Sequence, residues 1–154
     1  MKKVLSVLMV CALALCLFTA CSGGTTEAKP VADIYKQIEE TVTLPELIDS
    51  DSNYIKNYYA LDTADFEEYV FKSSADMMKA DTIILIKAKD TDTVKKVEEQ
   101  LSLILEQLKK ENENYNPSEY EIINKGQLAS KGNYVYLVIS PDVDAIVNVI
   151  NQNI

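Results

Sequence analysis

The sequence predicts an α+β fold with one mostly antiparallel sheet. Its length of 154 residues is typical of a single domain. Segments with an apolar residue every three or four positions alternate with short runs rich in β-branched and aromatic residues. Because the second kind of run comes in adjacent pairs, antiparallel hairpins are favoured over a parallel sheet. We expect the order α-α-β-β-α-β-β-α, with the long and C-terminal helices packed on one face of a four-stranded sheet.

The first half of the domain predicts two helices followed by two strands. Pro30 suits the first turn of a helix, and apolar residues follow it with spacings of 3, 4 and 4: Val31, Ile34, Ile38 and Val42. A short helix is expected over residues 52–59. Strands are expected over residues 67–73 and 81–88, since both runs are β-rich and bounded by Ser, Asp or Lys.

The longest predicted helix follows Asp90, whose side chain suits the capping position of a helix start. Its apolar residues have spacings of 3, 4, 3 and 4: Val94, Val97, Leu101, Ile104 and Leu108. The pattern fits either a coiled-coil seam or a helix laid on a sheet. It covers barely two heptads, which favours packing on the sheet. A further short helical turn is expected from Asn116.

The last third predicts a hairpin and a closing helix. Strands are expected over residues 125–130 and 134–139, joined through Gly132 and Asn133, which tolerate the positive φ of a tight turn. Ser140-Pro141-Asp142 is typical of a helix start. The apolar stripe of that helix is Val143, Ile146, Val147 and Ile150.

Residues 1–20 have the layout of a secretory signal peptide. Lys2 and Lys3 precede an apolar stretch, and small residues lead to Cys21. A membrane span is the alternative, but a span needs about 20 apolar residues and this run is shorter. The string Leu17-Phe18-Thr19-Ala20-Cys21 is similar to the lipobox of bacterial lipoproteins, although Phe18 stands where Leu is usual. A plain cleaved signal peptide remains the other reading.

The lipobox resemblance implies that the Cys21 thiol is acylated and holds the protein in the lipid bilayer. We therefore expect a signal peptide over residues 1–20, a lipidated Cys with a flexible tether over 21–30, and one domain over 31–154. The expected location is the extracytoplasmic face of the cell membrane.

The charge of the chain argues against nucleic acid as a partner. All 15 basic residues are Lys, and 24 residues are acidic, which gives a net charge of −9. Loss of Lys2 and Lys3 with the signal would leave 13 Lys against 24 acidic residues, a net charge of −11. Such a surface repels polyanions.

The composition also gives little support to catalysis, and no cofactor is expected. The chain has no His, and Cys21 is the one thiol left after signal removal, so pairs of Ser or Cys with His are excluded. Ser73 and Ser74 precede Lys79 at the wrong spacing for a Ser-x-x-Lys motif. We expect a protein that is not an enzyme. A hydrolase that uses Ser, Lys or carboxylates is the remote alternative.

Two acidic segments are candidate metal sites, and neither is expected to bind metal. Residues 49–53 resemble the start of an EF-hand loop, but Tyr54 and Ala60 stand where that loop needs Gly and Glu. Asp90 and Asp92 provide too few ligands for a hard cation. Both segments are expected to cap the helices that follow them.

Tyr54, Tyr58 and Tyr59 form the densest aromatic group and are the candidate binding surface. Tyr54 and Tyr58 share one face of the short predicted helix. Exposed rings would stack on sugars or anchor a partner protein. The alternative is that the rings cap the core and point their hydroxyls outward.

Several short strings, in order and spacing, resemble the bacterial lipoprotein domain named domain of unknown function 4358. The resemblance covers about residues 31–150, and Thr82 departs from the Glu that the family more often has. It implies a lipid-anchored protein of low-GC Gram-positive bacteria and brings no active site. The strings are Ala60-Leu61-Asp62, Phe66-Glu67-Glu68-Tyr69-Val70, Ala80-Asp81-Thr82-Ile83, Ile86-Lys87-Ala88-Lys89-Asp90, Tyr115-Asn116-Pro117-Ser118-Glu119, Lys131-Gly132-Asn133-Tyr134-Val135 and Leu137-Val138-Ile139-Ser140.

The functional expectation is a non-catalytic, membrane-anchored module that binds an envelope protein or another envelope component. The alternative is an accessory lipoprotein that binds a small ligand or a cation. The sequence offers no feature that separates the two.

Overall fold

The structure is a computed structural model, and it describes residues 28–154. The predicted signal peptide, Cys21 and most of the predicted tether lie outside the described residues. Among residues 28–154, no helix combines the length and the hydropathy that a membrane crossing requires.

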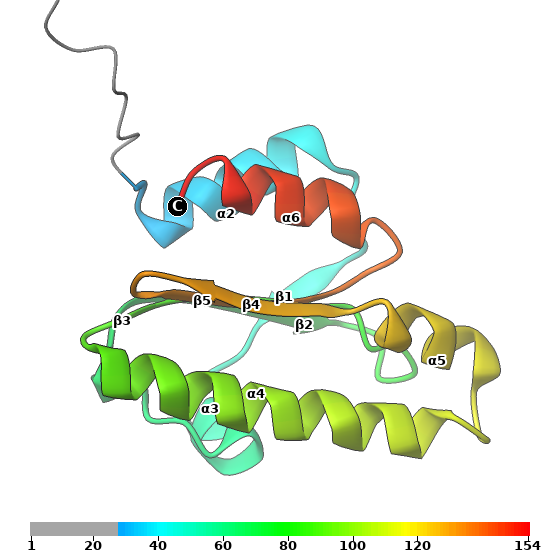
Figure 1. Ribbon diagram of the computed structural model, residues 1–154. Helices are drawn as coiled ribbons and strands as arrows, with labels where there is room; N and C mark the ends of the chain where they lie inside the picture. The colour runs from blue at the N-terminus through cyan, green and yellow to red at the C-terminus, as the bar shows by residue number, and fades with distance from the viewer. Residues whose placement is uncertain (1–27) are drawn as a thin grey trace, which may run out of the picture.

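One antiparallel sheet of five strands forms the middle of the molecule, in the order β1-β2-β3-β5-β4 (Figure 1). The strands are β1 (Leu47–Asp49), β2 (Phe66–Ser74), β3 (Thr82–Ala88), β4 (Gln127–Lys131) and β5 (Tyr134–Ile139). The central strand β3 pairs with both β2 and β5, and Ile84 lies opposite Phe71 on one side and Leu137 on the other. The predicted hairpins are therefore confirmed, including the turn at Gly132, where φ is +59°.

The prediction of four strands was wrong, because it missed β1. This edge strand has only three residues, and its Leu47 and Asp49 pair with Ser74 and Lys72 of β2. Three residues are too few to show the alternation of apolar and polar positions that marks a strand. Pro45 lies two residues before it, and proline is common at edge strands.

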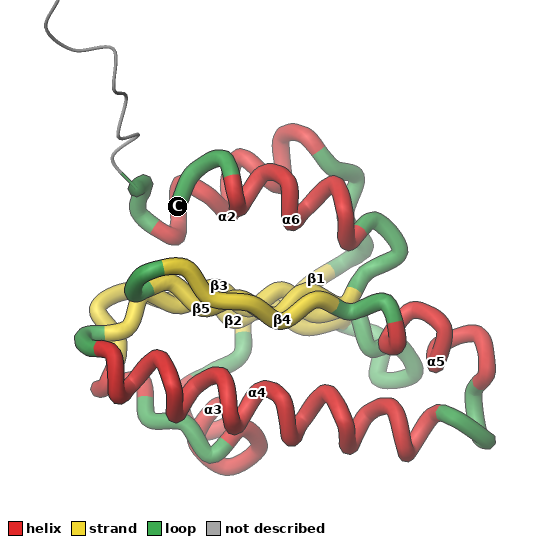
Figure 2. The backbone as a smooth tube through the Cα atoms, in the orientation of Figure 1, coloured by secondary structure: helices red, strands yellow, loops and turns green. Residues whose placement is uncertain are grey.

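Helices cover both faces of the sheet, as Figures 1 and 2 show. One layer contains the N-terminal and C-terminal helices, and the other contains the long helix and a short one beside it. The α5 helix lies at the end of the sheet next to the last turns of α4. The bounds are α2 (Val31–Thr41), α3 (Ser52–Tyr59), α4 (Thr91–Asn112), α5 (Pro117–Asn124) and α6 (Val143–Asn151), with a 3-10 turn η1 (Thr63–Asp65).

The long helix α4 and the C-terminal helix α6 pack on opposite faces, so the prediction that both cover one face was wrong. On β3, Ile84 and Ile86 belong to the core beneath α3 and α4, whereas Ile83 and Leu85 belong to the core beneath α2 and α6. Successive side chains of a strand point to opposite faces. An unbroken run of apolar residues in a strand must therefore be covered on both faces, and such runs occupy residues 83–86 of β3 and the whole of β5.

Candidate functional site

The predicted tyrosine group lies on α3, whose ends are both well defined. The Asp51 side chain accepts hydrogen bonds from the backbone N–H groups of Asn53 and Tyr54 at 2.8 and 2.9 Å. The helix ends at Ala60, which adopts the left-handed conformation with φ 54°. These ends fix the direction in which the three rings leave the helix.

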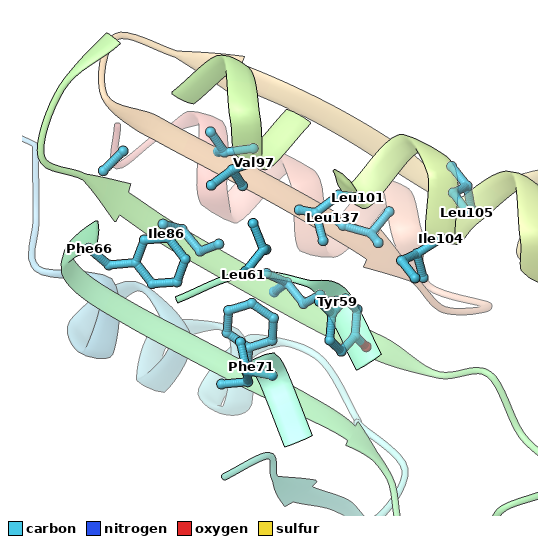
Figure 3. Close-up of a cluster of buried hydrophobic side chains, with 14 of the residues drawn as sticks. Tyr59, Leu61, Phe66, Phe71, Ile86, Val97, Leu101, Ile104, Leu105 and Leu137 are labelled. Carbon is cyan, nitrogen blue, oxygen red and sulfur yellow. The ribbon is translucent and has the colours of Figure 1, made fainter. Parts of the chain in front are cut away.

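The three tyrosines divide into one core residue and two surface residues. Tyr59 is 5% exposed and packs edge-on against Phe71, with ring centroids 5.4 Å apart (Figure 3). Tyr54 and Tyr58 are 43% and 36% exposed and stack on each other with centroids 5.3 Å apart. Both readings of the sequence thus hold in part. Burial is the main cause that raises the pKa of Tyr58 and Tyr59.

A cavity of about 390 Å³ lies beside the tyrosines. Its walls come from α3, from the loop between β2 and β3, from the last turns of α4 and from α5. The side chains that line it include three aromatic rings, two methionines and several carboxylates. The lining residues include Tyr54, Tyr58, Tyr59, Asp76, Met77, Met78, Lys79, Asp81, Glu111 and Glu119.

Two methionines at the tip of the β2–β3 loop are strongly exposed. Met77 is 96% exposed and Met78 is 61% exposed. The loop has defined turns, because Asp76 accepts the N–H of Met78 through its side chain at 2.9 Å and that of Lys79 through its carbonyl at 3.0 Å. The methionine side chains are therefore presented to solvent by an ordered turn.

Glu119 is a buried carboxylate that joins α5 to this loop. Its residue is only 1% exposed. Oε1 accepts the backbone N–H of Ala80 at 2.7 Å, and Oε2 accepts from Lys79 Nζ at 3.3 Å. A buried charge needs such partners to offset the loss of its hydration. Asn116 positions Glu119 in the first turn of α5, because its side chain accepts the Glu119 N–H at 3.4 Å.

Asp81 is a second buried carboxylate at the cavity, and it is poorly satisfied. The residue is 6% exposed, and among residues 28–154 its Oδ1 is the buried side-chain oxygen that lacks a hydrogen-bond partner. Burial, and secondly the nearby Glu119 carboxylate, raise the pKa of Asp81, while Lys79 acts in the opposite direction. Two carboxyl groups thus lie next to one cavity. Glu119 has a hydrogen-bond partner at both oxygens, whereas Oδ1 of Asp81 has none.

Sequence reasoning missed Asp81, Glu119, Met77 and Met78. The sequence predicts that Asp81 begins a strand and that Glu119 lies in a short helical turn. The two are brought together only by the packing of α5 against the β2–β3 loop, which no local pattern reveals. The one signal in the sequence that could have pointed to this site is the pair Met77 and Met78, two apolar residues in the connection between two predicted strands.

The two acidic segments act as helix caps and ion-pair partners. Asp51 caps α3, and Asp49 pairs with Lys72 at 2.8 Å. Asp90 accepts the N–H of Thr93 at 2.7 Å, and this hydrogen bond is the main cause that lowers the pKa of Asp90. Within residues 28–154, no group of three or more Asp, Glu, His or Cys side chains is arranged to hold a metal ion. The expected apolar stripe of α4 faces the core, with Leu101 fully buried.

Comparison with known proteins identifies a family for this chain. The model of a family described as "Domain of unknown function (DUF4358)" matches residues 40–140. No curated protein and no solved structure gives a significant match to the chain. The matched region includes α3, the β2–β3 loop, α4 and α5, and therefore all residues of the cavity described above. Since it spans more than half of the chain, the protein belongs to the DUF4358 family.

Proposed function

We propose that this protein is a non-catalytic binding module, anchored by an acylated Cys21 to the extracytoplasmic face of the cell membrane, that holds a partner protein of the envelope. The partner binds at the surface formed by Tyr54, Tyr58, Met77 and Met78, which we name the Tyr–Met surface. The observation that supports this most strongly is the gathering of these side chains around one cavity.

Eight large apolar side chains in residues 28–154 are exposed to solvent, and four of them line this one cavity. The other four, which do not line it, are Ile48, Tyr69, Leu103 and Tyr115. Clustered apolar exposure marks interaction sites, whereas single exposed residues are ordinary. Tyrosine and methionine are both enriched in protein interfaces, and methionine adapts its shape to a partner.

The position of the Tyr–Met surface suits a protein held at its N-terminus. Lys29 and Pro30, where the described chain begins, lie next to Lys87 at one end of β3. The Tyr–Met surface adjoins Thr82 at the other end of β3, about 17 Å away at the rise of a strand. In Figure 1 the start of α2 and the loop that joins β2 to β3 lie toward opposite ends of the sheet. The surface therefore lies at the end of the sheet opposite the start of the described chain.

The partner is tested by chemical crosslinking in intact cells, followed by recovery of the protein and mass spectrometry. Three forms are compared: the unchanged protein, the double variant Tyr58→Ala with Met77→Ala, and Tyr69→Ala as a control. Tyr69 is a matched control because its exposed fraction, 42%, is close to the 43% of Tyr54, and because it lies outside the cavity. We expect one partner to be lost from the double variant alone. Equal recovery from all three forms would contradict the proposal.

The anchor is tested separately by Cys21→Ser. We expect this variant to be released from membranes by a high-salt wash, because the acyl chains are the proposed attachment and the acidic domain has no electrostatic attraction to anionic lipid. Retention of Cys21→Ser on washed membranes would show that the attachment is something other than the lipid.

The alternative function, an accessory module for a small ligand, is favoured by the cavity itself. A volume of about 390 Å³ lies in the range of small-molecule sites. A ligand that binds only the native state raises the melting temperature of the protein. Thermal-shift screening that finds such a ligand, together with no protein recovered from the crosslinked cells, would favour this alternative over the partner protein.

A further inference from the structure

We propose that the cavity under the Tyr–Met surface receives an aliphatic ammonium group and that the Asp81 carboxylate is its counter-ion. This inference rests on the proposed function and names the chemistry that the partner presents there. The partner's group is a lysine side chain inserted between the tyrosine rings and the buried carboxylates.

The first support is the unpartnered oxygen of Asp81. Its Oδ1 is buried and without a hydrogen bond, although the residue lines an open cavity. A buried acceptor left without a partner costs free energy. Oδ1 itself has almost no accessible surface, so the Asp81 carboxyl group must turn toward the cavity for a donor there to reach it. The hydrogen bond then removes the cost, and a charged donor forms the stronger, charge-assisted bond.

The second support is the charge of the cavity wall. Four carboxylates line the cavity, from Asp76, Asp81, Glu111 and Glu119, and the lining has one ammonium, that of Lys79. The resulting excess of negative charge attracts cations and repels anions. The rings of Tyr54 and Tyr58 add aromatic faces, which also favour a cation.

The third support is that this wall already binds one ammonium group of the right kind. Lys79 Nζ lies 3.3 Å from Glu119 Oε2, while the Lys79 side chain remains half exposed. Lys79 thus neutralises Glu119 and leaves Asp81 without a hydrogen bond to Oδ1. A second ammonium, brought by the partner, would complete the pairing.

A divalent cation fits the site less well. Calcium takes six to eight oxygen ligands, and magnesium requires near-octahedral geometry. No group of three acidic side chains suited to a metal occurs within the described part of the chain. An ammonium group needs only two or three acceptors and gains from the aromatic rings.

The test is a titration of the purified full-length protein in detergent micelles, followed by NMR of ¹³C-labelled methionine methyl groups. The chain has four methionines, and the two beyond the predicted signal peptide are Met77 and Met78, so the probe reports on this cavity. The ligand is n-butylammonium, and 1-butanol is the neutral control of similar shape. We expect saturable shifts of the Met77 and Met78 signals with n-butylammonium and none with 1-butanol.

The residue assignment is tested in the same titration with two variants. Asp81→Asn should weaken n-butylammonium binding by about tenfold or more, since it removes the charge of the counter-ion. Asp92→Asn is the control, because Asp92 is fully exposed on α4 away from the cavity. Equal affinity in all three forms, equal response to 1-butanol, or a saturable response to Ca²⁺ that n-butylammonium does not displace would overturn the inference.

Cell crosslinking separates this inference from the proposed function. If Asp81→Asn loses the partner that the unchanged protein recovers, a lysine of the partner supplies the ammonium. If Asp81→Asn keeps the partner, the proposed function stands and the ammonium inference falls. If n-butylammonium binds but no partner is found in cells, the ammonium group comes from a free small amine. The proposal that the protein binds a partner protein is then wrong.

Discussion

Replacing Asp81 with Asn should stabilise the protein at neutral pH. The Asp81 carboxyl is buried, and its Oδ1 has no hydrogen-bond partner, while the Glu119 carboxylate lies nearby. An amide at this position carries no charge, and its NH₂ group can donate toward Glu119. The substitution keeps the size of the side chain, so the packing around it is retained.

The size of the effect follows from the cost of one buried, unsatisfied charged group. That cost is about 1–3 kcal/mol, so we expect Asp81→Asn to raise the free energy of unfolding by about this amount at pH 7. Because the native pKa of Asp81 is raised, its ionised form is less favourable in the native state than in the unfolded state. The destabilisation is therefore absent below the unfolded pKa of about 4 and grows as pH rises through the native pKa.

Urea denaturation at pH 7 and pH 3.5 measures both parts of this prediction. The stability difference between Asp81→Asn and the unchanged protein should be positive at pH 7 and should nearly vanish at pH 3.5. Asp92→Asn is the control and should differ little at either pH, because the Asp92 side chain is 97% exposed. An Asp81→Asn variant that is less stable at pH 7, or a difference independent of pH, would refute the reasoning.

Three further predictions test the packing. Ile146→Ala should lower the free energy of unfolding by about 2–5 kcal/mol in urea denaturation, because Ile146 is fully buried in the core beneath α6; a loss under about 1 kcal/mol would contradict that layer. Gly126→Ala should cost about 1–3 kcal/mol by the same measurement, since its Cβ would lie 2.9 Å from the Ile123 carbonyl oxygen; an unchanged stability would refute this contact. Tyr59→Ala should cost about 3–5 kcal/mol, whereas Tyr58→Ala, at the half-exposed ring, should cost far less; equal losses in thermal or urea unfolding would be inconsistent with the division between core and surface.

The sequence was sufficient for most helices and strands because their patterns are local. The 22-residue α4 has a capping Asp90 at its start and a repeated apolar stripe, and both features lie within one segment. The β4–β5 hairpin is similar, since Gly132 alone supplies the turn with positive φ. Patterns of this kind predict an element without knowledge of its neighbours.

The placement of the helices and the composition of the site depend on distant parts of the chain and were missed. The unbroken apolar runs in β3 and β5 indicate burial on both faces of the sheet. The prediction that both main helices cover one face did not use this signal. Asp81 directly precedes β3 and Glu119 lies in α5, and these two segments meet only in the folded protein. Neither residue has an unusual neighbour in the sequence, so its burial could not be predicted.

The most direct test of the account is photo-crosslinking in living cells with a photoreactive amino acid placed at Met77 and, separately, at Leu103. Both positions carry strongly exposed apolar side chains, and only Met77 belongs to the Tyr–Met surface. The account predicts one discrete protein adduct from position 77 that position 103 does not give, and loss of that adduct when Tyr58→Ala is added. Adducts of the same pattern from both positions, or none from position 77, would contradict the claim that this surface binds a partner protein.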